Sequence, residues 1–232
     1  MSWSLTPDEF AHVWRQADLD RLPYPLRVLE SPRTERDAQL LRAELAQRLP
    51  PNPDLDACLR ILAAPQTRVI AIGATADPGR ELRALGCVVY DRAVLAVQEP
   101  GRTPEFGGTI RLSIGHSAKL GARLAAVLPD SRAGRQPART ASAAAVRDTE
   151  TVVQEERAAA PIRKLLRAPH TAQGHIRIEA HLDQPKPPPP LHYTWLDLAN
   201  DGRYLLKADE SVHIVPASTE QLATHLQKRI PA

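Results

Sequence analysis

The chain has 232 residues, enough for one large domain or two small ones with a substantial buried core. Its 30 Lys and Arg residues nearly balance 27 Asp and Glu residues, and the net charge of +3 is not gathered into one dense patch, so composition gives little support to nucleic-acid binding. No apolar run reaches the roughly 18 residues that a membrane-spanning helix needs, and residues 1–4 do not open a signal peptide, so we expect a cytoplasmic protein without membrane insertion.

Three helices are predicted near the N-terminus. The first begins at Thr6–Glu9, which combines a capping hydroxyl, a proline in the first turn and a glutamate that can bond back to the cap. Ser31-Pro32 and Asn52-Pro53 give similar starts for the second and third helices. Residues 22–26, Leu-Pro-Tyr-Pro-Leu, cannot be helical because each proline forces its predecessor into extended geometry, so we expect a rigid apolar strap over a core.

From Thr67 the apolar pattern changes to a period of two, which is typical of strands. Segments 68–74, 80–91 and 93–99 predict an antiparallel meander. A further strand over 109–113 and a helix over 120–128 complete this part of the chain.

Residues 130–150 place Arg132, Arg135 and Arg139 among Gly, Pro, Ser, Thr and Ala, with too little apolar surface to pack. This composition predicts a flexible linker. An arginine-bearing linker could contact phosphates, so a nucleic-acid-binding regulatory protein is the alternative function, and its affinity would fall steeply with salt.

The second part of the chain resembles the first in its predicted elements. A helix passes through Ile162 and Leu166, and strands follow over 175–182, 191–198, 203–207 and 212–215. Ser218, with Gln221 three residues later, predicts the cap of a closing helix.

Part of this pattern occurs twice. The apolar skeleton of residues 110–129 recurs at residues 212–231 with a constant shift, and the motif Leu-x-Ala-Pro-x-Thr occurs at residues 62–67 and 166–171. A constant shift is typical of internal repeats, whereas chance alignment in an Ala-rich chain is the alternative. We therefore predict a single domain over residues 1–232, made of two pseudo-repeats at about 52–129 and 156–231 that are joined by the linker 130–150.

The sequence contains no convergent set of catalytic residues. It lacks a Gly-rich phosphate loop, a G-x-S-x-G elbow, an H-E-x-x-H motif and a metal-spaced cysteine pair. Cys58 and Cys87 lie in apolar segments, which favours buried free thiols in a reducing compartment. We expect no enzyme activity, metal or cofactor, and an interaction module instead; a small-molecule enzyme or binder would need a deep pocket with converging polar groups.

A series of short motifs resembles the EspG family, cytosolic chaperones associated with ESX (type VII) secretion in actinobacteria. The motifs run from end to end in the family's order: Leu5-Thr6-x-x-Glu9-Phe10-x-x-x-Trp14, Leu22–Leu26, Val94–Val97, Leu128-Pro129, Leu165-Leu166-x-x-Pro169, Gly202–Leu205, Pro216-Ala217 and Leu222. Residues 130–155 and the proline run 187–190 match no family motif.

The resemblance implies an α+β fold in which a quasi-two-fold antiparallel sheet is flanked by N-terminal and C-terminal helical bundles. It also implies the function of a chaperone that binds the helical tip of the PPE subunit in a PE-PPE heterodimer, keeps it soluble and delivers it to the secretion system, without a cofactor. We expect the free protein to be a monomer or a weak dimer.

Strand alternation predicts which residues would contact such a partner. We expect Ile176, Ile178, Val212 and Ile214 to face the core. The predicted partner contacts, on the rim of an open sheet face, are Arg177, Glu179, Arg203, Lys207 and His213. A register error of one residue would exchange the two faces.

Overall fold

The structure, a computed structural model, describes residues 1–77, 80–103, 105–147 and 157–231. The first half of the chain forms, in order, β1 (Ser2–Leu5), α1 (Pro7–Gln16), α2 (Glu35–Arg48), α3 (Pro53–Ala63), β2 (Thr67–Thr75), β3 (Glu81–Val89), β4 (Arg92–Pro100), β5 (Gly107–His116), a 3-10 turn (Ser117–Lys119) and α4 (Leu120–Ala125).

The second half forms β6 (Arg139–Ser142), α5 (Ala143–Arg147), α6 (Ala159–Arg167), β7 (His170–Glu179), β8 (Leu191–Leu198), β9 (Arg203–Ala208), β10 (Ser211–Pro216) and α7 (Thr219–Gln227). Each half therefore begins with an edge strand and helices, continues with four strands and ends with a helix. Helix α2 has no counterpart among the residues of the second half that the structure describes.

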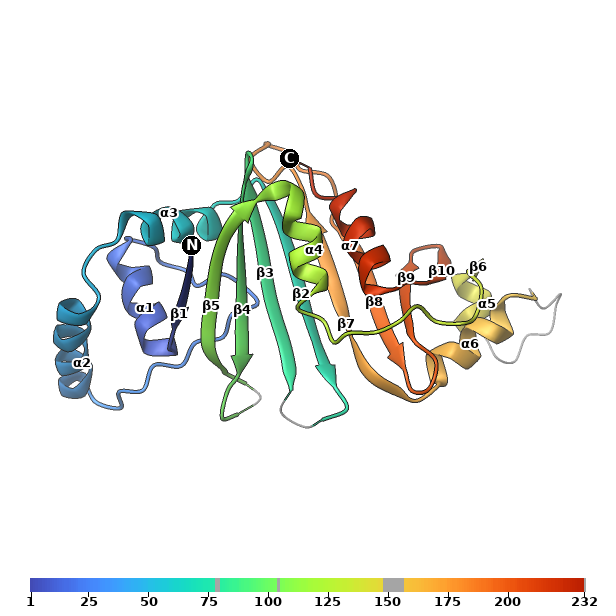
Figure 1. Cartoon of the computed structure of the whole chain (residues 1–232), viewed down its shortest axis with the longest axis horizontal. Coiled ribbons are helices and arrows are strands. Elements are labelled where there is room, and N and C mark those ends of the chain that lie inside the picture. Colours follow the sequence, from blue (N-terminus) through green and yellow to red (C-terminus); the bar gives the residue numbers. More distant parts are fainter. Residues whose placement is uncertain (78–79, 104, 148–156, 232) are drawn as a thin grey trace.

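All ten strands form one antiparallel sheet with the order β1-β5-β4-β3-β2-β7-β8-β9-β10-β6. Strands β2 and β7 are the middle pair, and each half continues outward from them, which gives the molecule quasi-two-fold symmetry (Figure 1). The predicted α+β fold, a quasi-two-fold antiparallel sheet with helices at both ends, is confirmed. None of the described helices is long and apolar enough to cross a membrane.

Both edge strands lead directly into a capped helix. Before α1, the Thr6 hydroxyl accepts from the Glu9 N–H (3.3 Å) and the Glu9 carboxylate accepts from the Thr6 N–H (2.7 Å). Before α5, the Ser142 hydroxyl accepts from the Ala145 N–H at 3.2 Å. Because these bonds satisfy N–H groups that the first helical turn leaves free, the same local device ends the edge strand in each half.

Three apolar clusters cover the sheet from both sides. Helices α4 and α7 pack side by side over the middle of one face, in the cluster that contains Val69 and Leu205. Helices α1 and α3 pack on the opposite face of the first half, in the cluster of Ile70, and α5 and α6 do so in the second half, in the cluster of Tyr204. Consecutive strand residues point to opposite faces of a sheet. Val69 and Ile70 lie in different clusters, as do Leu205 and Tyr204, so both faces of the sheet carry helices.

Part of the predicted linker 130–150 belongs to this framework. Residues 139–142 pair with β10 as β6, and residues 143–147 form α5 over the cluster of Tyr204. The prediction missed both elements because their buried side chains, Ala141, Ala143 and Val146, are small and give a weak apolar pattern, and because the strand that pairs with β6 lies far away in the chain. Residues 148–150 lie outside the described residues. The repeat boundaries stay a prediction, and the common order of elements begins earlier, at β1 and β6.

Candidate functional site

The helices leave the middle of one sheet face uncovered, between the group α1 and α3 and the group α5 and α6. Strand β7 crosses this region with strict alternation: Gln173, His175 and Arg177 are exposed, whereas Gly174 and Ile176 are buried. We define the open face by eight residues of β2, β7 and β8 that point to this side: Arg68, Ile72, Gln173, His175, Arg177, Glu179, His192 and Thr194.

A single row of paired residues runs across all ten strands on this side of the sheet. The row is Leu5, Ile110, Gln98, Arg83, Ile72, His175, Thr194, Leu206, Ile214 and Arg139. Residues opposite each other in antiparallel strands share a face. The outer Ile110 and Ile214 are buried under the two helical groups, so the uncovered surface is centred on the pair Ile72 and His175.

An ion-pair network lies at one end of the open face. The Glu179 carboxylate accepts from Arg68 of β2 and from Arg177 of its own strand, at 2.5 Å each. Glu179 is only 8% exposed, whereas the Arg177 side chain is 46% exposed. Both oxygens of the carboxylate are therefore occupied within the protein, and Arg177 is the member of the network that a partner can reach.

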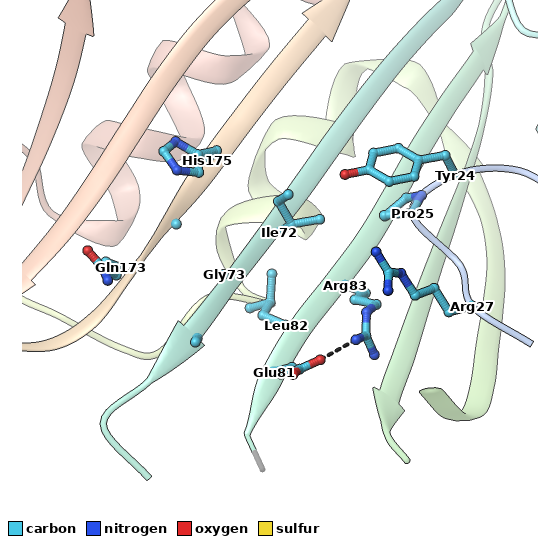
Figure 2. Close-up of a pocket in the computed structure, with 12 residues that line it drawn as sticks. Tyr24, Pro25, Arg27, Ile72, Gly73, Glu81, Leu82, Arg83, Gln173 and His175 are labelled. Carbon is cyan, nitrogen blue, oxygen red and sulfur yellow. Dashed lines mark hydrogen bonds and ion pairs between the residues drawn. The ribbon is translucent and has the colours of Figure 1, made fainter. Parts of the chain in front are cut away.

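A cavity of about 460 Å³ opens on the same side of the sheet, between β7 and the strap. Figure 2 shows Tyr24, Pro25 and Arg27 on one side of Ile72, and Gln173 and His175 on the other. The cavity is lined by polar side chains, by the apolar Ile72 and Leu82 and by the strap, and it is open rather than enclosed. Such a surface is suited to contact with a protein rather than to burial of a small molecule.

The buried side chain of Gln98 holds the strap in place. Its amide oxygen accepts from the Arg27 N–H and its amide nitrogen donates to the Arg27 carbonyl, both at 2.9 Å. The same carbonyl accepts from the Gly107 N–H at 2.9 Å, and Leu26 is buried in the cluster of α1 and α3. The predicted strap over a core is therefore confirmed, and it lies at the border of the open face.

The predicted partner contacts do not lie on one face. Arg177 and Glu179 belong to the open face. Thr194 of that face pairs with Leu206, so the alternate β9 residues Arg203 and Lys207 point to the opposite side. His213 pairs with Lys207 and points there too. The prediction of one common rim is wrong, because Ile178 packs under α7 while Ile214 packs near α6 on the other face.

Arg203 also lies in the interior, with none of its side chain exposed. Its guanidinium donates to both Asp197 carboxylate oxygens, at 2.6 and 2.8 Å, and to the carbonyl of Pro129. The prediction that Arg203 lies on an exposed rim is therefore wrong: this arginine ties the connection between the halves to β8 and β9. The four predicted core residues, Ile176, Ile178, Val212 and Ile214, are all buried.

Three further residues of this site, Tyr24, Arg68 and Ile72, are not identified as such by the sequence pattern. Alternation along β2 indicates that Arg68 and Ile72 share a face. Their position beside His175 and Glu179, however, depends on the pairing of β2 with β7, which are about a hundred residues apart in the chain. Local periodicity carries no information on that pairing.

The described residues offer no metal or thiolate chemistry. Among them, no group of three or more His, Cys, Asp or Glu residues could hold a metal ion. Burial raises the pKa of the Cys58 thiol to about 12 and also raises that of Cys87, so both thiols stay protonated and unreactive near neutral pH.

Two of the three arginines proposed to contact phosphates, Arg132 and Arg135, are engaged within the protein. The Arg132 Nε donates to the Asp201 carbonyl at 2.9 Å, and the Arg135 side chain lies 3.5 Å from the Asp201 carboxylate. Both therefore fasten the connection between the halves to the turn after β8. This arrangement does not favour the nucleic-acid alternative.

Comparison with known proteins agrees with this architecture. The model of the EspG family matches residues 6–228. The chain is also similar in fold to the Mycobacterium tuberculosis type VII secretion system chaperone EspG5, solved in complex with the PE25-PPE41 dimer: the TM-score is 0.67 and the identity 16%, over 99% of this chain and 95% of that one. A search of curated proteins found no match. Because the family model covers nearly the whole chain, this protein belongs to the EspG family.

Proposed function

We propose that this protein is a cytosolic chaperone that binds the helical tip of a PPE protein in a PE-PPE heterodimer, keeps that tip soluble and directs it to a type VII (ESX) secretion system. Membership of the EspG family supports this function, as does the fold shared with EspG5, which was solved with a PE-PPE dimer. The protein acts by binding alone and needs no cofactor.

The observation that carries the proposal is the uncovered middle of an otherwise helix-covered sheet. The row across the sheet is buried at Ile110 in the first half and at Ile214 in the second, and it is open at Ile72, His175 and Thr194. A stable protein interface buries about 1,600 Å² in total, so the partner would extend from the open face onto the flanking helices and the strap. Of the predicted contacts, we retain Arg177 as a direct contact and Glu179 as the residue that positions it.

The function is tested by co-expression with PE-PPE pairs from the same organism, followed by size-exclusion chromatography. A stable complex that contains all three chains is the expected result. Failure to co-elute with any of several pairs would contradict the proposed function and leave the fold unaffected.

The choice of face is tested by matched substitutions, His175→Trp and His213→Trp. Each histidine is exposed on a strand and lies within hydrogen-bond distance of a threonine hydroxyl, at 3.1 Å for Thr194 and 2.9 Å for Thr140. Tryptophan is well tolerated in strands, so both variants should fold. We expect His175→Trp to prevent co-elution and His213→Trp to leave it intact. The reverse result would assign the interface to the face of Lys207 and His213.

A further inference from the structure

We propose that the strap, residues 22–27, sets the orientation of the partner on the open face, with Tyr24 as its principal contact. This inference rests on the proposed function, because it concerns how the bound tip lies. The strap belongs neither to the strands of the open face nor to the ion-pair network of Glu179, so it would be a separate determinant of specificity.

The strand arrangement under the open face is nearly symmetric, although its side chains differ between the two halves. Along the row of paired residues, strands β2, β3 and β4 carry Ile72, Arg83 and Gln98, and the corresponding strands β7, β8 and β9 of the other half carry His175, Thr194 and Leu206. A long helical partner laid over such a surface meets similar strand geometry in two orientations that differ by half a turn. A selective binder needs a feature that makes one orientation worse than the other.

The strap is a feature of that kind because its anchor exists in only one half. The Gln98 amide can bond both the N–H and the carbonyl of Arg27, whereas the equivalent Leu206 has no polar atoms for this purpose. The chain between α1 and α3 spans residues 17–52, but only residues 148–158 separate α5 from α6. In the described part of the second half, no segment takes the place of the strap.

The strap presents Tyr24 in a fixed position. Pro23, Pro25 and Leu26 are buried, while Leu22 is 37% and Tyr24 51% exposed. The flanking prolines restrict the backbone, so little conformational entropy is lost when a partner contacts the tyrosine.

Tyr24 also supplies the chemistry that the open face lacks. The eight residues of that face include no aromatic side chain, and Ile72 is its one apolar member. Tyrosine is enriched among the residues that dominate binding energy, because it combines a large apolar ring with a hydroxyl. A partner tip with an exposed apolar side chain would place it between Tyr24 and Ile72, and the rest of the tip would extend toward Thr194.

The test compares Tyr24→Ala with Tyr90→Ala in the purified complex. Tyr90 is 72% exposed but lies in the turn between β3 and β4, away from the cavity, so it is a matched control for loss of a surface tyrosine. Titration calorimetry with the same PE-PPE pair should show at least a tenfold loss of affinity for Tyr24→Ala and an unchanged affinity for Tyr90→Ala. Equal affinity of both variants and wild type would overturn the inference while leaving the chaperone function in place.

Orientation is measured with p-benzoylphenylalanine at position 24. One cross-linked segment of the PPE tip is the expected result, since the strap admits a single orientation. Cross-links to two segments on opposite sides of the tip would overturn the inference even if affinity depends on Tyr24. If the wild-type protein binds no PE-PPE pair, the proposed function itself is wrong, and the inference is withdrawn with it.

Discussion

At the scale of single residues, we expect folding stability to be most sensitive to substitution in the buried ion pair of Arg203 and Asp197. Both side chains are almost completely buried. Asp197→Ala removes the counter-charge and leaves a buried guanidinium unpaired, so we expect the free energy of unfolding to fall by about 3–5 kcal/mol, measured by urea denaturation. The double variant Asp197→Leu with Arg203→Met should recover part of that loss, because it also removes the buried charge.

The control is Asp209→Ala, which breaks the exposed pair of Lys207 and Asp209 (2.6 Å). Solvent screens this pair, so the variant should unfold close to the wild-type urea concentration. Equal destabilisation by Asp197→Ala and Asp209→Ala would contradict the role assigned to burial.

His225 makes stability depend on pH. Burial, together with the positive charges of Arg229 and Lys228, lowers its pKa from 6.5 to about 4. Between pH 6.5 and about 4, His225 therefore binds a proton in the unfolded chain but not in the folded protein. The free energy of unfolding falls as the pH drops through this range. We expect a loss of about 1–2 kcal/mol for this partly buried ring. In His225→Gln the loss over this range should be smaller; an identical pH profile would contradict the assignment.

At the scale of elements, Gln98 determines whether the strap stays in place. Gln98→Leu leaves the N–H and the carbonyl of Arg27 without this partner, at a cost of about 1–3 kcal/mol for unpaired buried polar groups. We expect faster hydrogen exchange at the Arg27 amide and faster proteolysis after Arg27, with unchanged exchange in β7. Uniform acceleration over the whole sheet would indicate global destabilisation instead of release of one element.

At the scale of the whole molecule, the two halves meet through β2 and β7 and through α4 and α7. Gly73 and Gly174 face each other across the central strand pair, and the Trp195 ring lies against both. A Cβ atom on Gly174 would collide with this ring and with the main-chain oxygen of Ile72. We expect Gly174→Ala to reduce the free energy of unfolding by about 1–3 kcal/mol in chemical denaturation.

The matched control for the junction is Gly86→Ala. Its added Cβ would lie 3.1–3.3 Å from methyl groups of Leu120 and Leu124, which are flexible ends of side chains. The cost should therefore be smaller than for Gly174→Ala. If Gly86→Ala lowered the free energy of unfolding more than Gly174→Ala does, close packing at the junction of the halves would not be the more sensitive contact.

Much of the local structure could be predicted because its causes are local. Thr6 and Ser218 cap helices as expected, since the cap and its bonding partner are three residues apart. Alternation correctly identified Ile176 and Ile214 as buried. The alternation of apolar residues did not reveal that Ile176 and Ile214 are buried on opposite faces of the sheet. Such a pattern separates the two sides of one strand but does not indicate which helices cover each side.

The sequence by itself determined the positions of most strands and helices and the strap, because hydrogen-bonding caps, prolines and apolar periods act over a few residues. Only the tertiary structure decided that β6 joins the sheet, that Arg203 is an interior ion-pair partner, and that Tyr24, Ile72 and His175 border one surface. These features depend on contacts between residues far apart in the chain, and strand pairing across ten strands creates those contacts only when the chain folds.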